Sequence, residues 1–158
     1  MTDQDNSNIT ENSIVILREV TKENLREILN LEVAPDQKKF VAPNAVSIAQ
    51  AYFDREIAWF RAIYADETPV GFVMMVDNPS ESEYYLWRYM IDARYQGFGF
   101  GWRALELVVE YVKTRPNAKE FFTSCVPGDD GPYKFYEKFG FKPTGEMEDD
   151  EIVMRLAL

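Results

Sequence analysis

Arg94-Tyr95-Gln96-Gly97-Phe98-Gly99-Phe100-Gly101 lies in the middle of this chain, and the arrangement of the surrounding elements follows from it. A strand-like run at residues 84–91 precedes it, and an amphipathic helical pattern follows it directly. The three glycines permit a tight turn with uncovered backbone N–H groups, and a helix start adds unpaired donors and a positive dipole end. This stretch, called the glycine loop below, therefore predicts an anion site suited to a diphosphate.

The length of 158 residues is typical of one domain with its own hydrophobic core. We expect residues 1–12 to form a disordered acidic tail and residues 13–158 to form a single domain. Cys125 is the one cysteine, so no disulfide can form within the chain, and a reducing compartment, the cytoplasm, is expected. No run reaches the roughly 18 apolar residues that span a bilayer, so no membrane partner is expected.

The charge balance is acidic, with 27 Asp and Glu against 17 Lys and Arg and a formal net charge of −10. This disfavours nucleic acid as a partner, because phosphate backbones are bound by a surplus of Lys and Arg. It would attract a small cationic molecule such as an amine, although solubility alone also accounts for such a charge. Part of the charge is concentrated near the carboxyl terminus, at Glu146, Glu148, Asp149, Asp150 and Glu151.

Histidine is absent from the chain. Hydrolysis by a Ser-His-Asp triad and the common zinc sites are therefore excluded, and no metal site is expected. Proton transfer must use carboxylates, tyrosine, lysine, the cysteine or water, because the usual general base is missing.

The hydrophobic patterns predict an α/β fold. Strands are expected at 13–18, 58–65, 70–76, 84–91, 120–126 and 152–156, and helices at 21–31, 44–53, from the glycine loop to Pro116, and from Gly131-Pro132 to Gly140. The strand before the glycine loop, the helix after it and the next strand form one βαβ unit, whose two strands should be parallel. The rest of this mixed α+β sheet should be largely antiparallel.

Two other diphosphate sites can be tested against the glycine loop. A nucleotide P-loop would end in Gly-Lys-Ser/Thr, whereas this loop ends in Gly101-Trp102-Arg103. A dinucleotide fingerprint would have a third glycine where Trp102 stands. These absences disfavour both sites, while a purely structural turn remains an alternative.

The carboxyl half of the chain resembles a known family. Residues 96–101, followed by Tyr136-Glu137-Lys138-Phe139-Gly140-Phe141, resemble the two signatures of the GNAT family of N-acetyltransferases. Residues 86–97 and 144–158 are similar to bacterial spermine/spermidine (diamine) acetyltransferases of that family, and the likeness covers residues 57–158. It implies the GNAT acyl-CoA N-acyltransferase fold, whose parallel βαβ unit binds CoA.

The same resemblance implies an activity: transfer of an acetyl group from acetyl-CoA to a primary amine. The expected acceptor is a small cationic amine, a polyamine or diamine such as spermine or spermidine, attacked directly in a ternary complex by a homodimeric enzyme. Two alternatives stay open, namely an acetyltransferase for a protein or amino-acid amine, and a non-catalytic module that senses CoA or polyamines. A covalent route through Cys125 is less expected, because that residue lies within an apolar strand.

The resemblance also implies a set of cofactor-binding residues. The pantetheine arm of CoA pairs with main-chain groups of the strand before the glycine loop, and the diphosphate lies on the loop. Asp129 stands where many relatives carry an asparagine, and a carboxylate cannot donate the hydrogen bonds of an amide. The full set is Met90, Ile91, Asp92, Arg94, Gln96, Gly97, Phe98, Gly99, Phe100, Gly101, Asp129 and Lys138.

For catalysis, Tyr136 stands at the family's general-acid position. A phenol with a pKa of about 10 is reasonably matched to a thiol leaving group of about 8.5, although the same tyrosine could simply pack in the core. The general base is open, with Glu83 as the candidate. Glu32 and Asp36 are expected to anchor the charge of the amine, and Trp87 to form an aromatic wall against it.

Overall fold

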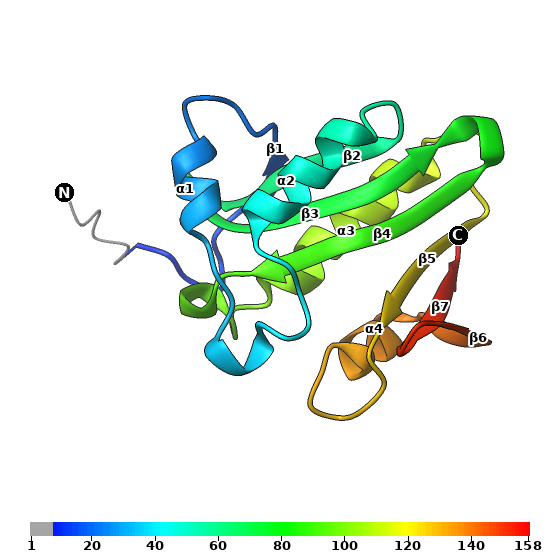
Figure 1. Ribbon diagram of the computed structural model, residues 1–158. Coiled ribbons are helices and arrows are strands. Elements are labelled where there is room, and N and C mark those ends of the chain that lie inside the picture. The colour runs from blue at the N-terminus through cyan, green and yellow to red at the C-terminus, as the bar shows by residue number, and fades with distance from the viewer. Residues whose placement is uncertain (1–7) are drawn as a thin grey trace.

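The computed structural model describes residues 8–158, which form one seven-stranded sheet with helices on both faces (Figure 1). The strands are β1 (Val15–Arg18), β2 (Ala58–Ala65), β3 (Thr68–Asn78), β4 (Glu83–Ile91), β5 (Glu120–Cys125), β6 (Lys142–Glu148) and β7 (Glu151–Ala157). The helices are α1 (Leu25–Asn30), α2 (Asn44–Phe53), α3 (Phe100–Lys113) and α4 (Tyr133–Phe139), with short 3-10 turns η1 (Pro35–Gln37), η2 (Pro79–Glu81) and η3 (Ala93–Tyr95).

The sheet has the strand order β1-β2-β3-β4-β5-β7-β6. All neighbouring strands are antiparallel except β4 and β5, which α3 connects and which run parallel. The predicted fold class, a largely antiparallel sheet with one parallel βαβ unit, is therefore confirmed. Only two residue pairs join β4 to β5, Tyr85 with Phe122 and Leu86 with Thr123, and beyond them the strands diverge (Figure 1).

The two faces of the sheet are covered by different helices. In β2, Ala62 and Tyr64 pack with α1 and α2, whereas Ile63 packs with α3 on the opposite face, as the two-residue period of a strand requires. The predicted apolar face of the helix after the glycine loop is confirmed, because its residues are buried: Leu105, Val108, Val109 and Val112. Figure 1 shows α1 and α2 in front of β2 to β4 and α3 behind them, with no helix in front of β5 and β7.

Helix 44–53 and strand 58–65 have the predicted bounds, but the first helix is shorter than predicted. It begins at Leu25 instead of Thr21. The Asn24 side chain accepts a hydrogen bond from the Thr21 N–H at 2.7 Å, and this holds residues 21–24 in a turn before the helix. Asparagine and threonine favour such local bonds over helix, which explains the shift.

One strand, β6, was not predicted. Every residue of β6 is exposed, so the strand lacks the apolar alternation by which strands are recognised, and it also contains Pro143 and Gly145. It is the edge strand beside β7 and pairs with it antiparallel. The pairing joins Glu148 to Glu151 at the hairpin tip.

The predicted tail falls partly outside the described residues, which begin at residue 8. In the part that is described, Ile9 packs against the core. The Arg103 guanidinium donates hydrogen bonds to the carbonyls of Glu11 and Ser13, both at 2.8 Å. Residues 9–12 are thus held against α3, a tertiary contact that their polar composition did not predict.

Asp92 joins the amino-terminal helices to the glycine loop. Its carboxylate is buried and accepts hydrogen bonds from the Arg94 N–H and guanidinium, both at 2.9 Å, and from the Glu32 N–H at 3.0 Å. Burial by itself raises the pKa of Asp92, but these hydrogen bonds outweigh burial, and the net effect lowers the pKa. The ionised carboxylate therefore stabilises the junction between α1 and the end of β4.

We predict that Asp92→Asn destabilises the protein at pH 7 by about 2 kcal/mol, the usual cost of losing hydrogen bonds to a charged group. Because the pKa is lowered in the folded state, the contribution is complete above the unfolded-state pKa of about 3.9 and is lost as pH falls through the folded-state value. Urea unfolding should show the difference from wild type shrinking below about pH 4. The exposed Asp36→Asn is the control, and a difference that does not vary with pH would contradict the assignment.

Candidate active site

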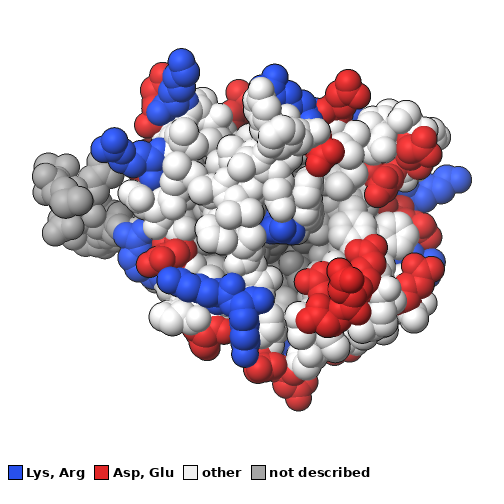
Figure 2. Space-filling model, in the orientation of Figure 1, with Lys and Arg blue, Asp and Glu red and all other residues white. Residues whose placement is uncertain are grey.

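A cavity of about 920 Å³ lies where β4 and β5 diverge. One wall is β4 from Tyr85 to Ile91, the opposite wall is β5 from Thr123 onward, and one end is the glycine loop. Residues 37–43, between α1 and α2, and the start of α4 complete it. Figure 2 shows a hollow near the centre of this face with a cluster of acidic side chains beside it.

A β-bulge in β4 directs two consecutive side chains toward this cavity. Arg88 pairs with Met74 while Leu86 pairs with Met75, so Trp87 is the extra residue. Trp87 packs with the cluster under α1 and α2, and the Arg88 guanidinium, which donates to Gln50 Oε1 at 3.2 Å, lies on the same face. Trp87 lines the cavity, and its role as an aromatic wall against the acceptor stays a prediction.

The glycine loop has the geometry expected of an anion site. Gly97 and Gly99 have φ values of 86° and 83°, and a Cβ at either position would have no neighbour within 4 Å. Gly99 is the N-cap of the 14-residue α3, so the first-turn N–H groups of that helix point into the loop. Phe100 is buried and stacks on Phe98 with ring centroids 5.3 Å apart, which anchors the loop in the core.

Further contacts fix the loop at both ends. The Tyr89 hydroxyl donates to the Gly101 carbonyl, and the Gln96 side chain donates to the Ile91 carbonyl at 2.9 Å. Gln96 also donates to Gln37 Oε1 at 2.8 Å, which ties the loop to the α1–α2 connection. The residues present therefore fit a diphosphate held by backbone N–H groups next to the open edge of β4.

The structure brings only some of the predicted cofactor residues to the cavity. Met90, Ile91 and the loop residues Gln96, Gly97, Gly99, Phe100 and Gly101 line it. Arg94 is paired with Asp92. The described residues that line the cavity do not include Phe98, Asp129 or Lys138.

Asp129 forms an ion pair with Lys134 at 3.4 Å. Helix α4 begins at Tyr133 with Pro132 as N-cap and without a side-chain cap, so Asp129 does not cap this helix. The carboxylate therefore has a local partner on α4, and Asp129 is not among the described residues that line the cavity.

Tyr136 lies in the cavity and in the core at once. It is 6% exposed, packs against Phe135 and Phe141 with ring centroids 5.5 and 5.6 Å away, and lines the cavity beside Thr123. Burial raises the pKa of the Tyr136 phenol well above its ordinary value. The phenol is therefore protonated at neutral pH, the state that a general acid needs.

The predicted carboxylates lie elsewhere. Glu83 is exposed at the start of β4, at the end away from the glycine loop, while Glu32 pairs with Lys38 at 3.3 Å and Asp36 is exposed in η1. None of the three is among the described residues that line the cavity. Sequence position alone could not place them, because the α1–α2 connection and the far end of β4 had no predicted spatial relation to Tyr136.

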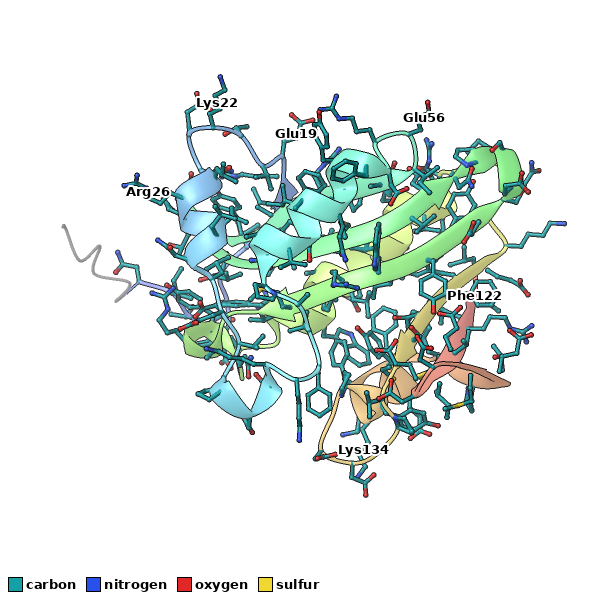
Figure 3. All side chains as sticks on the ribbon, in the orientation of Figure 1. Glu19, Lys22, Arg26, Glu56, Phe122 and Lys134 are labelled. Carbon is teal, nitrogen blue, oxygen red and sulfur yellow. The ribbon has the colours of Figure 1, made fainter. Side chains whose placement is uncertain are left out.

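The acidic residues that do line the cavity are Asp130, Glu148 and Glu151. Glu148 and Glu151 come from the tip of the β6–β7 hairpin, and the Tyr85 hydroxyl donates to Glu148 at 3.3 Å. Figure 3 shows Phe122, which stacks on Tyr85, on the part of β5 that α1 and α2 leave uncovered. The sequence contained a signal for these carboxylates, the carboxyl-terminal acidic cluster, but β6 was missing from the prediction.

Cys125 also lines the cavity, and its thiol is buried beside the sulfur of Met154 at 3.7 Å. Burial raises the pKa of Cys125 to about 11. The thiol is therefore protonated at neutral pH and is a poor nucleophile, which favours direct transfer over a covalent route.

Within residues 8–158, no three His, Cys, Asp or Glu side chains are placed together to hold a metal ion. Among the helices of residues 8–158, none combines the length and the apolar character that crossing a lipid bilayer requires.

Comparisons with known proteins find acetyltransferases among the proteins similar to this chain. The spermine/spermidine N(1)-acetyltransferase of Bacillus subtilis (strain 168) is 26% identical over 140 residues, covering 84% of this chain and 90% of the relative. Three solved structures share the fold. A domain from Methanocaldococcus jannaschii has a TM-score of 0.74 at 20% identity, covering 93% of this chain and all of its own.

The other two were solved with ligands. PaiA N-acetyltransferase from Thermoplasma acidophilum in complex with coenzyme A has a TM-score of 0.67 at 17% identity, covering 92% of this chain and 99% of its own. Spermidine N-acetyltransferase from Vibrio cholerae in complex with CoA and spermine has a TM-score of 0.71 at 16% identity, covering 90% of this chain and 95% of its own.

The model of the acetyltransferase (GNAT) family matches residues 22–141, which include β4, the glycine loop, α3 and the Tyr136 segment. This match confirms the family and the activity that the sequence resemblance implied. The chain belongs to the acetyltransferase (GNAT) family and is an N-acetyltransferase that uses acetyl-CoA.

Proposed function

We propose that this enzyme acetylates a primary amine of a small polyamine or diamine, such as spermidine or spermine, by direct attack in a ternary complex. The observation that carries the proposal is the layout of the cavity. It extends from the glycine loop, past the buried Tyr136 phenol, to the acidic tip of the β6–β7 hairpin. The name of the Bacillus relative and the spermine bound in the Vibrio structure support the same acceptor class.

The cofactor end of the cavity provides main-chain groups. Beyond Leu86, β4 has no strand partner on the β5 side, so its N–H and C=O groups are available to an extended ligand arm, as at the edge of a sheet. Met90 and Ile91 lie on this free edge, and the glycine loop follows it. Backbone donors are useful here because the chain is acidic and offers few cations for a diphosphate.

The transfer step needs a proton for the leaving thiol. Acetyl-CoA supplies a thioester, whose C–S bond breaks as the acceptor nitrogen forms the new C–N bond. In total the ammonium form of the acceptor loses two protons, one of which ends on the thiol and one in solvent. Tyr136 is the group we propose as donor to the thiol, with its own proton restored from the acceptor nitrogen.

Arg88 supports a second acceptor class. Its guanidinium lines the cavity and donates to neutral oxygens, the Trp87 carbonyl at 3.0 Å and Gln50, while no carboxylate of the described residues lies within 4.0 Å. An acceptor with a carboxylate beside its amine, such as an amino acid or a peptide, would supply the missing anion.

The homodimer and the cytoplasmic location expected from the sequence remain predictions.

The proposal is tested by measuring thiol release from acetyl-CoA with the purified protein. The acceptors are spermine, spermidine, short diamines, amino acids and peptides. We expect the highest kcat/KM for the polyamines or diamines. Turnover of amino acids or peptides without turnover of diamines would favour the second class, and no turnover with any of these amines would contradict the proposal.

Removing the proposed acid should separate chemistry from folding. Tyr136→Phe keeps the aromatic packing against Phe135 and Phe141 but removes the phenol proton, so kcat should fall about 100-fold or more. Acetyl-CoA affinity and thermal stability should change little. A variant with wild-type turnover would reduce Tyr136 to a packing residue.

The glycine loop can be tested with two alanine substitutions that carry equal backbone strain. Gly99→Ala forces a side chain into positive φ, which costs of order 1 kcal/mol or more, and should weaken acetyl-CoA binding about tenfold by calorimetry. Gly145→Ala is the matched control, because Gly145 in β6 has a φ of 89° and equally open surroundings. It should lose similar stability without losing cofactor affinity.

A further inference from the structure

The tip of the β6–β7 hairpin places two like charges directly opposite each other. Glu148 and Glu151 are register partners, joined by the turn residues Asp149 and Asp150. Like charges at opposed positions of an antiparallel pair destabilise it. Within residues 8–158, no Lys or Arg nitrogen lies within 4.0 Å of either glutamate, so neither forms an ion pair in the described part of the protein.

The surroundings of Glu151 hold its carboxylate in the cavity. Glu151 Oε2 accepts a hydrogen bond from Ser124 Oγ at 2.8 Å, and both residues line the cavity. The register of β5 with β7, which pairs Cys125 with Ile152, sets Glu151 beside the carboxyl end of β5. This is the end at which β4 and β5 diverge and where Thr123 and Tyr136 lie.

The charge of Glu151 acts on four groups that line this cavity. Burial sets the direction of the pKa shifts of Tyr85, Arg88, Cys125 and Tyr136, and in each case the negative charge of Glu151 raises the pKa. Glu151 therefore lines the same cavity as the phenol that we propose as the acid, and Ser124 holds its carboxylate there.

We infer that Glu151 is the acceptor-binding residue of this enzyme, the ionic partner of the ammonium group that is to be acetylated, and that Ser124 positions it. This inference rests on the proposed function and assigns its acceptor site to the β6–β7 hairpin instead of to Glu32, Asp36 or Glu83. An ammonium ion has three donors, and the carboxylate oxygens of Glu151 and Glu148 are its nearest charged acceptors. The ring of Tyr85, stacked on Phe122, closes the side of the site.

The inference explains why the like-charge pair exists. A cationic acceptor neutralises the repulsion between Glu148 and Glu151, so binding energy is gained at the point where the free protein is destabilised. An uncharged acceptor does not neutralise the repulsion and gains no binding energy from it. Glu151 therefore selects for a charged acceptor.

Glu151→Gln tests this, because the amide still accepts the Ser124 hydrogen bond but carries no charge. For the best diamine or polyamine of the acceptor panel, kcat/KM should fall about 30- to 100-fold, the loss expected for one charge-assisted contact. Acetyl-CoA affinity should stay at the wild-type value, and the melting temperature should not fall, because the substitution relieves the repulsion with Glu148. Glu146→Gln is the matched control, since it removes the same charge from an exposed residue of the same hairpin, and its kcat/KM should stay within about twofold of wild type.

A primary amine that is uncharged at neutral pH, such as trifluoroethylamine, provides the second measurement. Glu151→Gln and wild type should acetylate it at similar rates, because the lost interaction is with charge. If Glu151→Gln lowered kcat/KM equally for charged and uncharged acceptors, or weakened acetyl-CoA binding, Glu151 would have a structural role and the inference would be overturned. A variant as active on diamines as Glu146→Gln would also overturn it. Failure of the wild-type protein on all amines would instead count against the proposed function.

Discussion

The separation of β4 and β5 is the constraint on which the rest of this structure depends. Two parallel strands joined by only two residue pairs cannot share further hydrogen bonds, so the edges of both are free along the cavity. The bulge at Trp87 and the aromatic residues of α4 hold this opening, since Phe135 stacks on Tyr89 with ring centroids 6.4 Å apart. The Tyr89 hydroxyl then fixes the start of α3 through the Gly101 carbonyl. One local failure of pairing thus creates the cavity, exposes main-chain groups to a ligand arm and orients the glycine loop.

Charge is distributed unevenly along the cavity of this scaffold. An acidic protein can bind an anionic cofactor because the glycine loop uses backbone N–H groups and a helix dipole, which leave the net charge unchanged. The opposite end of the cavity carries Glu148 and Glu151, which suit a cation. Between them lies the buried phenol of Tyr136, kept protonated by its surroundings. The two ends of the cavity thus differ in electrostatic character, with backbone N–H donors at one end and carboxylates at the other.

The sequence predicted the elements that have strong local signals. Helix 44–53 and strand 58–65 were predicted with their observed bounds, because apolar spacing and the flanking Pro43 define them. The glycine loop and the Tyr136 segment identified the family, since each needs particular residue types at particular places. β6 was missed because no residue of it is buried, and the start of α1 was misplaced because Asn24 stabilises a competing turn. These errors occur where local side-chain bonding or tertiary pairing, and not hydrophobic periodicity, decides the structure.

The sequence by itself determined the family and the cofactor, because these reside in short contiguous motifs, and one of these motifs contains Tyr136, which we propose as the proton donor. Tertiary structure alone decided which carboxylates reach the cavity. Glu83, only two residues before the cavity wall begins at Tyr85, is exposed outside it, whereas Glu151, fifteen positions after Tyr136, lies in the cavity with it. The physical reason is that β7 inserts beside β5 and its register fixes the hairpin tip at the divergence of β4 and β5. Strand order and register are non-local properties, and the acceptor side of the site depends on both.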